Sequence, residues 1–407
     1  MTKILLLENP HQVADEHFAD AQDLDINVER IEGSLDAPEL IERLQGKDIV
    51  GIRSKTNITE QVLDACPQLQ VVATFSIGTN QIDIPACTKR GIAIFNAPYS
   101  NTRSVVELVI SDIVALQRRM PEKNAQVHRG EWEKSATGSH EVRGKTLGII
   151  GYGSIGTQLS VVAEALGMNV IFYDLQERLA IGNATKLNSM EDVLRNSDYI
   201  SLHIDGRPSN NNLIGEKEFA MMRDGAVFIN LARGQVVDID ALAAALESGK
   251  ISGAAVDTYP TEPKKNGDPF ESPLLKYPNT ILTPHIGGST LEAQESIGHF
   301  VSGKIVDYLR NGATDMSINF PNMTMEAHQD ARYRIALFHR NVPGVLARLN
   351  ALFAEQNVNI NGQLLGTQGE YGYVLADIAS ELPIEVIAAI RDREETIRLR
   401  VMEAPQA

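Results

Sequence analysis

Short apolar runs alternate with stretches of helical periodicity through the first hundred residues of the chain. The runs Ile4–Leu7, Ile49–Ile52, Val71–Phe75 and Ala93–Phe95 are continuous, which predicts parallel strands that are buried on both faces. The longer stretch Val105–Arg119 repeats its apolar residues at helical spacing and predicts a helix leading into a second domain. The first hundred residues are therefore expected to form a doubly wound α/β layer.

The same alternation continues around a glycine-rich turn, Gly151–Gly156, which reads Gly-Tyr-Gly-Ser-Ile-Gly. The apolar run Leu147–Ile150 precedes this turn, and a helical pattern follows it to about Leu166. The next apolar run, Val170–Tyr173, ends in Asp174, which lies 18 residues after the last glycine. Strand, glycine turn, helix, strand and acid at this spacing predict a dinucleotide-binding site. Further strands are expected at Tyr199–His203, Ala226–Asn230 and Ala254–Val256.

Glycines in this turn let the backbone bend tightly and approach a pyrophosphate, whose charge suits a helix N-terminus. The cofactor contacts of the turn are expected from Gly151, Gly153, Ser154, Ile155 and Gly156. Asp174 can accept hydrogen bonds from both ribose hydroxyls and would repel a 2′-phosphate, which favours NAD over NADP. Glycine turns also occur for packing alone, but here the surrounding strand, helix and acid favour the cofactor.

Residues 321–331 show no clear period and are expected to form a linker to a small third domain. Strands are expected at Arg334–Phe338, Val358–Leu365, Tyr371–Asp377 and Ile397–Val401, and helices from Pro343 to about Asn357 and over Pro383–Arg391. The order β-α-β-β-α-β predicts a ferredoxin-like fold.

Composition excludes several classes of partner. The chain has 407 residues, of which 43% are hydrophobic, and a net charge of −16, so neither nucleic acid nor an anionic membrane is expected to bind. An anionic substrate would need a local cluster of cations. The two cysteines, Cys66 and Cys87, predict neither a metal site nor a disulfide framework, and no apolar stretch reaches 18 residues. The starting run is too short for a signal peptide, so a cytoplasmic location is expected.

Three residues after the glycine turn, Arg233, Glu262 and His285, suit the oxidation of a 2-hydroxy acid. Arg233 offers a bidentate fork for the carboxylate, and His285 can take the hydroxyl proton. Glu262 can hydrogen-bond His285 and stabilise its cationic form. Each residue alone could be an ordinary loop residue; together, downstream of a dinucleotide motif, they indicate catalysis.

The segments Asn230–Asp238, Ala255–Pro263 and Thr283–Thr290 resemble the D-isomer-specific 2-hydroxyacid dehydrogenases. Ser76–Asp83 and Asn96–Ser104 make the resemblance closer to the members that oxidise D-3-phosphoglycerate. The resemblance covers nearly the whole chain. It implies NAD-dependent formation of 3-phosphooxypyruvate, the first step of phosphorylated L-serine biosynthesis.

The resemblance also implies a domain organisation of two doubly wound parallel-sheet domains and a C-terminal ferredoxin-like ACT domain. Residues 1–100 and 287–320 would form the substrate domain and residues 101–286 the Rossmann NAD domain. The linker 321–331 would lead to the ACT domain, residues 332–407. The two crossings between the first two domains would form a hinge, with the active site in the cleft.

Site residues follow from the resembling motifs. Cofactor contacts are expected, beyond the glycine turn and Asp174, from Leu231, Ala232, Arg233, Asp257, His285, Ile286, Gly287 and Gly288, with Asp257 on the nicotinamide carboxamide. Substrate contacts are expected from Arg53, Ser54, Lys55, Gly78, Asn101 and Lys134, and no metal is expected. Arg53 and Lys55 would read the phosphate, although a solvated loop is the plainer interpretation. Lys134 lies beside Trp132 in an arm that would reach a partner subunit; a buried intrachain Trp132 is the alternative.

The ACT module binds amino acids between paired copies, which implies a regulatory site. His339, Asn341 and Asn359 are the expected contacts for L-serine, and two kinds of paired surface would give a homotetramer. The plainer interpretation is that Asn341 caps a helix. Ala331-Arg332 occupies a position where some relatives carry paired glycines, so a glycine hinge is absent.

Two other functions stay open. A related reductase of glyoxylate, hydroxypyruvate or 2-oxoglutarate would not need Arg53 and Lys55. An NAD-sensing binding protein would not need Arg233, Glu262 and His285 together. Turnover of D-3-phosphoglycerate separates these possibilities.

Overall fold

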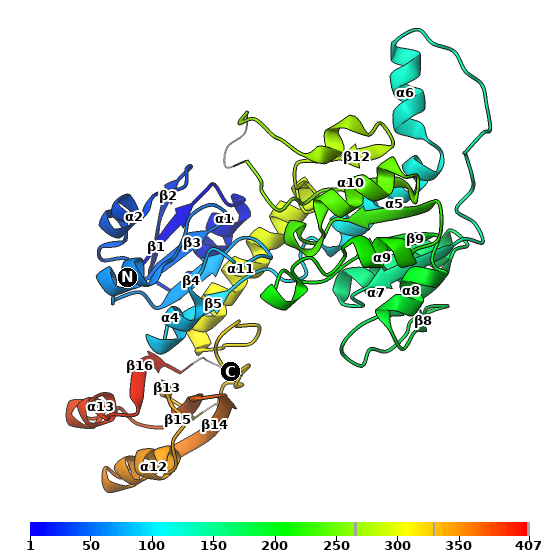
Figure 1. The fold of residues 1–407 in the computed structure, drawn as a ribbon. Helices are drawn as coiled ribbons and strands as arrows, with labels where there is room; N and C mark the ends of the chain where they lie inside the picture. Colours follow the sequence, from blue (N-terminus) through cyan, green and yellow to red (C-terminus); the bar gives the residue numbers. More distant parts are fainter. Residues whose placement is uncertain (264–266, 329, 405–407) are drawn as a thin grey trace. The chain divides into compact units, whose positions relative to one another are not determined.

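The computed structural model of the chain describes residues 1–263, 267–328 and 330–404. Within these residues the chain forms a five-stranded, a seven-stranded and a four-stranded sheet (Figure 1). Because each sheet has its own helices and buried apolar side chains, the predicted class of two doubly wound sheets and a smaller C-terminal domain is confirmed.

Contacts between residues divide the chain into two compact units. The first unit comprises residues 1–100 and 294–407 and holds the five-stranded and four-stranded sheets. The second unit comprises residues 101–293 and holds the seven-stranded sheet. The C-terminal sheet therefore packs with the first sheet rather than standing as a unit of its own.

Parallel pairing runs throughout the five-stranded sheet, in the order β2-β1-β3-β4-β5. Its strands are β1 (Thr2–Leu7), β2 (Ile26–Ile31), β3 (Ile49–Ile52), β4 (Val71–Thr74) and β5 (Ala93–Phe95). Along β1, Ile4 and Leu6 join one core cluster while Leu5 and Leu7 join another, so the strand is buried on both faces. The four predicted strands are confirmed. The edge strand β2 was not predicted, because its residues are partly exposed and form no continuous apolar run.

Helices of the first unit cover both parallel and antiparallel sheets (Figure 1). They are α1 (Val13–Asp20), α2 (Ala37–Leu44), α3 (Glu60–Ala65), α4 (Ile84–Lys89), α11 (Leu291–Asn311, entering the unit at Gln294), α12 (Val345–Glu355) and α13 (Ile384–Arg391). Asn357 follows α12 with φ of 57°, in agreement with the predicted end of that helix.

The C-terminal sheet is antiparallel, in the order β14-β15-β13-β16. Its strands are β13 (Tyr333–Arg340), β14 (Ile360–Gln368), β15 (Tyr371–Ile378) and β16 (Thr396–Glu403). With α12 and α13 they give the predicted β-α-β-β-α-β order. One face packs on these two helices, whereas Phe338 and Tyr373 on the other face join the core cluster of the first sheet.

The seven-stranded sheet is parallel, in the order β12-β11-β10-β9-β6-β7-β8. Its strands are β6 (Thr146–Ile150), β7 (Asn169–Tyr173), β8 (Thr185–Lys186), β9 (Tyr199–Leu202), β10 (Ala226–Asn230), β11 (Ile251–Val256) and β12 (Thr280–Leu282). The helices of this unit are α5 (Thr102–Gln117), α6 (Met120–His128), α7 (Ser154–Ala165), α8 (Met190–Asn196), α9 (Glu216–Met221) and α10 (Ile239–Glu247). The strand order reverses between β6 and β9, which is where such sheets bind ligands beyond the carboxyl ends of their strands.

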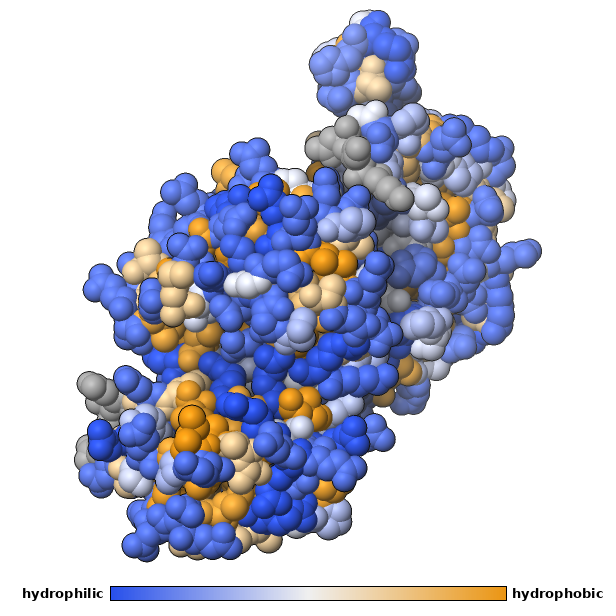
Figure 2. Space-filling view, turned by 90° about the vertical axis from the view of Figure 1, so that its left-hand side faces the viewer, coloured by the Kyte–Doolittle hydropathy of each residue, from blue (hydrophilic) through white to orange (hydrophobic). Residues whose placement is uncertain are grey.

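The viewed surface in Figure 2 is mostly hydrophilic, with apolar residues gathered over its lower part. Exposed apolar side chains in the C-terminal domain include Leu364 and Leu365 on the edge strand β14. No helix in the described part of the chain is both long enough and apolar enough to cross a membrane.

Candidate active site

Three neighbouring strands of the second unit place the three predicted catalytic side chains. Arg233 follows β10, Glu262 follows β11, and His285 follows β12. Because these strands are parallel and adjacent, the loops after them lie at the same edge of the sheet. Residues separated by up to 52 positions in the sequence are thereby brought to one end of one sheet.

His285 and Glu262 form a direct pair. His285 Nδ1 lies 2.9 Å from Oε2 and 3.1 Å from Oε1 of Glu262, and Glu262 Oε1 also accepts a hydrogen bond from the Tyr259 amide at 3.1 Å. The hydrogen bond to Glu262 raises the pKa of His285 above its ordinary value, against the opposing effect of burial. A proton on Nδ1 leaves Nε2 as an acceptor, on a side chain that is 49% exposed.

The partner carboxylate stays ionised. Burial raises the pKa of Glu262, but its hydrogen bond and charge interaction with His285, its Tyr259 amide bond and the Arg233 charge together bring it below its ordinary value. An ionised Glu262 is the form that orients His285 and stabilises an imidazolium.

Arg233 is a partly buried cation beside this pair. Burial lowers the pKa of its guanidinium, while the charges of Asp205 and Glu262 act in the opposite direction. Its Nη1 donates to the Ala232 carbonyl at 2.6 Å, and the Asn230 side-chain amide donates to the Arg233 carbonyl at 3.1 Å. Arginine keeps its proton in proteins, so Arg233 can bind a carboxylate at this edge.

Asp257 anchors the loop that carries His285. This buried carboxylate accepts hydrogen bonds from the Thr283 hydroxyl at 2.6 Å and from the Ile286 and Gly287 amides at 2.8 Å each. His285 lies between these contacts with φ of 55°, a left-handed conformation that costs free energy for a non-glycine residue. The sequence predicted a nicotinamide contact for Asp257 and did not predict this anchoring role, since no sequence pattern pairs an acid with amides 30 residues away.

The glycine turn after β6 has the geometry of a phosphate site. Gly151 has φ of 94°, and a Cβ added there would lie 2.4 Å from the His203 carbonyl oxygen. A Cβ on Gly156 would lie 2.3 Å from the Gly151 carbonyl oxygen. A Cβ on Gly153 would meet nothing within 4 Å, so open space lies over the N-terminus of α7, beside Ser154 and Ile155. The turn therefore fits a pyrophosphate approaching the backbone.

Asp174 stands at the carboxyl end of β7, next to this turn. Its carboxylate accepts hydrogen bonds from the Tyr152 and Gln176 amides, each at 2.8 Å. Arg178 lies 3.6 Å from the same carboxylate, a contact that the sequence analysis did not predict. The structure thus brings the acid and the glycine turn together, as a ribose and a pyrophosphate of one dinucleotide require.

The remaining predicted cofactor and crossing residues lie at the same edge. Leu231 and Ala232 are buried after β10, and Ile286, Gly287 and Gly288 follow His285. A Cβ on Gly288 would lie 2.2 Å from the Asn101 side-chain nitrogen, so the two chain crossings lie against one another. The buried Oδ1 of Asn101 has no hydrogen-bond partner within the described residues.

The predicted phosphate-binding residues lie in the first unit. Arg53 follows β3, and its Nη2 donates to Gln294 Oε1 at 2.7 Å. Ser54 and Lys55 are exposed. The Gly78 carbonyl accepts the Ser76 hydroxyl at 2.9 Å, which fixes the turn where a backbone contact was predicted.

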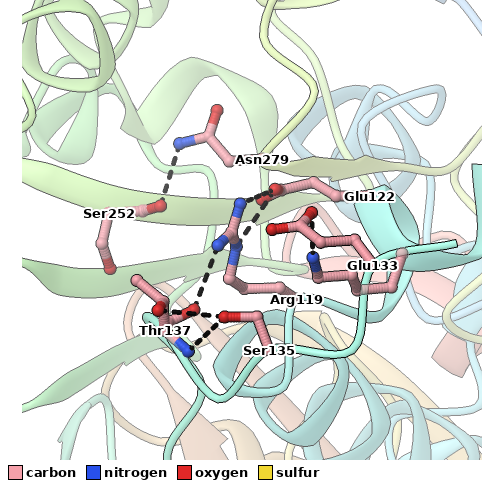
Figure 3. Close-up of polar contacts among 8 residues, drawn as sticks. Arg119, Glu122, Glu133, Ser135, Thr137, Ser252 and Asn279 are labelled. Carbon is pink, nitrogen blue, oxygen red and sulfur yellow. Dashed lines mark hydrogen bonds and ion pairs between the residues drawn. The ribbon is translucent and has the colours of Figure 1, made fainter. Parts of the chain in front are cut away.

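Lys134 lies away from the trio within its own unit. It belongs to an exposed arm that follows α6. Lys123 of α6 pairs with Glu133 of the arm at 2.7 Å, and Arg119, which precedes α6, donates to the Thr137 carbonyl of the arm at 3.1 Å (Figure 3). Trp132 is 85% exposed, so the alternative of a buried intrachain tryptophan is wrong.

The base of the arm borders a polar cavity of about 700 Å³ at the amino ends of the seven-stranded sheet. There the Asn279 amide donates to the Ser252 carbonyl at 2.9 Å (Figure 3). The acids of its lining, Asp198, Asp224 and Glu122, are paired with basic side chains inside the unit. This cavity is at the end of the sheet opposite to the glycine turn and is therefore separate from the candidate active site.

The predicted effector residues are spread along the C-terminal sheet. His339 is buried, with Nδ1 at 2.7 Å from the Arg340 carbonyl oxygen, and burial lowers the pKa of its imidazole. Asn341 donates to the Gly369 carbonyl at 3.3 Å, at the turn between β14 and β15. Asn359 precedes β14, and its carbonyl accepts the Ala379 amide at the far end of β15. One chain therefore does not bring Asn341 and Asn359 together.

Comparison with known proteins assigns families to two regions. Residues 110–287 match the family described as D-isomer specific 2-hydroxyacid dehydrogenase, NAD binding domain. Residues 335–398 match the AHAS small subunit-like ACT domain. The first region contains Arg233, Glu262 and His285, and the second contains most of the C-terminal sheet.

Solved structures show the same architecture. D-2-hydroxyisocaproate dehydrogenase superposes with a TM-score of 0.70 at 29% identity, over 78% of this chain and all of the other. The D-lactate dehydrogenase of Aquifex aeolicus, complexed with NAD and lactic acid, gives a TM-score of 0.67 at 25% identity, over 78% of this chain and 100% of that chain.

Curated relatives match over nearly the full length. D-3-phosphoglycerate dehydrogenase of Haemophilus influenzae is 48% identical over 98% of this chain and 97% of its own. The Escherichia coli K12 enzyme of the same name is also 48% identical, with the same coverage. D-3-phosphoglycerate dehydrogenase 1 of Saccharomyces cerevisiae is 44% identical over 93% of this chain and 82% of its own. The chain therefore belongs to the D-isomer-specific 2-hydroxyacid dehydrogenase family, in the group of the D-3-phosphoglycerate dehydrogenases.

Proposed function

We propose that this protein oxidises D-3-phosphoglycerate to 3-phosphooxypyruvate with NAD, the first step of phosphorylated L-serine biosynthesis. The observation that carries the proposal is the pair of His285 and Glu262 beside Arg233, at the edge of the sheet that also holds the glycine turn. The activity for which these relatives are named supports the choice of substrate.

The chemistry needs a base, a cation and a hydride acceptor. His285 Nε2 accepts the C2 hydroxyl proton, and Glu262, which holds Nδ1, stabilises the imidazolium. Arg233 binds the substrate carboxylate and polarises the C2 oxygen. The glycine turn around Gly153 and the carboxylate of Asp174 would hold NAD, which when bound would supply the acceptor for the hydride from C2.

The phosphate distinguishes this substrate from those of the related reductases. Arg53 and Lys55 supply two cations on one loop, in a chain whose net charge is −16. Glyoxylate and hydroxypyruvate have no phosphate and do not require these two cations, whereas a phosphate dianion binds well to them.

Steady-state kinetics test the proposal. The purified protein is expected to reduce NAD with D-3-phosphoglycerate at a kcat/KM at least tenfold above that with D-glycerate, the same acid without phosphate. Equal values for the two acids would favour another 2-hydroxy acid as substrate. Absence of any turnover, with NADH binding retained, would favour an NAD-sensing binding protein.

Regulation and assembly belong to the same proposal. L-Serine is proposed to bind between two C-terminal domains from different subunits, because Asn341 and Asn359 lie at opposite ends of one sheet. Pairing along the edge strand β14 would cover the exposed Leu364 and Leu365. With a second pairing surface at the arm that carries Trp132, the assembly would be a homotetramer, which light scattering measures.

Two buried free thiols, Cys66 and Cys87, support the proposed cytoplasmic location.

A further inference from the structure

Arg53, Ser54, Lys55 and Thr56 form the loop that follows β3, here called the Arg53 loop. Three successive amides of this loop, those of Ser54, Lys55 and Thr56, donate to a single acceptor group. Successive N–H groups that converge in this way form a concave site that attracts an anion. This loop is proposed to bind the substrate phosphate. If another anion already accepts these three amides, only the side chains of the loop are available to the phosphate.

The occupant is a side chain of the protein itself, Glu8. Glu8 Oε2 accepts the Ser54 and Lys55 amides at 3.0 Å each, and Oε1 accepts the Thr56 amide at 2.7 Å. Glu8 is only 8% exposed, and no cationic nitrogen of the described residues lies within 4.0 Å of its carboxylate. The partial positive charges of the three amides therefore stabilise the buried carboxylate of Glu8.

Backbone conformation directs Glu8 into this position. Glu8 immediately follows β1, and both Glu8 and Asn9 adopt left-handed conformations, with φ of 66° and 51°. Two successive non-glycine residues with positive φ cost free energy, which the contacts of the folded chain must offset. Strain of this kind at the carboxyl end of a strand is typical of functional sites.

Other contacts hold the remaining parts of the loop. The Thr74 hydroxyl donates to the Arg53 carbonyl at 3.1 Å, and the Gln81 side-chain amide donates to the same oxygen. Gln294 on α11 accepts from the Arg53 guanidinium at 2.7 Å. Lys55 has an exposed side chain, so the backbone is fixed while its charged group remains available.

We propose that Glu8 is a positioning residue for substrate binding, which fixes the Arg53 loop so that Arg53 and Lys55 present their charges to the substrate phosphate. This inference rests on the proposed function. It parallels the role of Asp257, whose carboxylate holds the Ile286 and Gly287 amides of the His285 loop. Because Glu8 already fills the site formed by the amides, the phosphate is bound by side chains rather than by the backbone of the loop.

The test compares Glu8→Gln with a matched control. Glutamine has the size of glutamate but one acceptor oxygen, so at least one of the three amides loses its acceptor. Asp48→Asn is the control, because Asp48 also accepts a backbone amide, that of Lys3 at 2.8 Å, but precedes β3 at the opposite end of the sheet. Neither substitution changes the trio or the glycine turn.

Kinetics give the first readout. In Glu8→Gln the KM for D-3-phosphoglycerate is expected to rise roughly tenfold, while kcat and the KM for NAD stay within about twofold of the parent values. The KM for D-glycerate is expected to change little, because that acid has no phosphate. A purely structural defect would instead lower the active fraction and leave every KM unchanged, as expected for Asp48→Asn.

Hydrogen exchange gives a second readout that does not depend on turnover. The amides of Ser54, Lys55 and Thr56 are expected to exchange at least about tenfold faster in Glu8→Gln than in the parent or in Asp48→Asn. Parent-like exchange, or an unchanged or lowered KM for D-3-phosphoglycerate, would overturn the role of Glu8. A parent enzyme that does not prefer D-3-phosphoglycerate over D-glycerate would instead overturn the proposed substrate, and exchange would still decide whether Glu8 holds the loop.

Discussion

His285 combines three constraints in one side chain. Its backbone is left-handed, its loop is held by Asp257, and its Nδ1 faces Glu262. These contacts fix both the tautomer and the direction of Nε2, which is what a proton acceptor requires. The proposed proton transfer therefore depends on one ring nitrogen, and the loss of that nitrogen should have a defined kinetic signature.

Replacing His285 with asparagine is expected to lower kcat by on the order of 10²- to 10⁴-fold, because a positioned acid–base group is lost. NADH binding, measured by fluorescence titration, is expected to change little. The control is His140→Asn, because His140 borders the cavity at the amino ends of the sheet. Near-parent turnover in His285→Asn would remove His285 from the mechanism.

The pH profile tests Glu262. His285 must be neutral to accept a proton, so oxidation rises with pH through the His285 pKa, which Glu262 raises. Glu262→Gln removes the carboxylate, so this pKa falls and the acidic limb of kcat/KM is expected to move to lower pH. The reverse reaction needs a protonated His285, so its rate falls as pH rises through the same pKa. In Glu262→Gln this basic limb should also move to lower pH. An unmoved limb would mean that another group titrates.

Among single residues, the sequence predicted those whose types suit the reaction only in combination. Arg233, Glu262 and His285 could be proposed as catalytic residues because an arginine, a glutamate and a histidine follow the glycine turn Gly151–Gly156. The roles of Asp257 and Glu8 could not, because each carboxylate binds amides 29 to 48 residues away and carries no local signal. Such contacts become visible only when the parallel strands bring distant loops to one edge.

Among the elements, the β6–α7–β7 unit was predicted most completely. A continuous apolar run, a glycine turn and a helical period specify the strand, the turn and the helix almost to the residue. The strand β8 was missed because it has two residues, and β12 was missed because its three residues are only partly buried and contain a two-residue apolar run, unlike the fully buried β5. β12 nevertheless positions His285, so a short element that carries little sequence signal completes the site.

Cofactor choice is a property of this unit. Asp174→Ala is expected to lower kcat/KM for NAD and to raise the ratio of NADP to NAD use, because repulsion of a 2′-phosphate disappears while Arg178 remains. The measurement is kcat/KM with each cofactor. Asp224→Ala, an exposed acid paired with Lys250, is the control. A parent enzyme that uses both cofactors equally would contradict the role given to Asp174.

At the scale of the first unit, a buried ion pair joins three segments. Arg334 on β13 binds Asp377 on β15 through two hydrogen bonds, and both side chains are fully buried. The same guanidinium donates to the carbonyl of Asn311, the last residue of α11. It also donates to the carbonyls of Met325 and Glu326 in the linker. Met325 and Glu326 of the linker are thus held in place by hydrogen bonds from Arg334.

Removing this arginine is expected to destabilise the first unit strongly. Arg334→Leu leaves the Asp377 charge buried without a partner, which typically costs about 3–5 kcal/mol of unfolding free energy. The double variant with Asp377→Leu is expected to recover much of that loss. Urea unfolding followed by tyrosine fluorescence measures the stability of both variants, and a single variant as stable as the parent would contradict the account. Arg310→Leu, which breaks an exposed pair with Asp23, is the control.

Helix α11 would couple L-serine binding in the C-terminal domain to the Arg53 loop. Helix α11 begins near Gln294, which binds Arg53, and ends at Asn311, whose carbonyl binds Arg334 of the C-terminal domain. One continuous helix therefore links the proposed phosphate-binding loop to the sheet proposed to bind L-serine. Ala331-Arg332 provides no glycine hinge, so any movement of that sheet would be transmitted through packed contacts.

Serine titration by calorimetry and by activity tests this arrangement in the parent and in Asn341→Ala. L-Serine has an ammonium and a carboxylate, and asparagine can accept from one and donate to the other. The parent is expected to show both heat and inhibition, and Asn341→Ala to lose both. Asn350→Ala should keep both, because the Asn350 amide pairs with Gln363 of its own chain. Heat without inhibition would place the failure in the coupling through α11, whereas neither heat nor inhibition in the parent would remove serine as the effector.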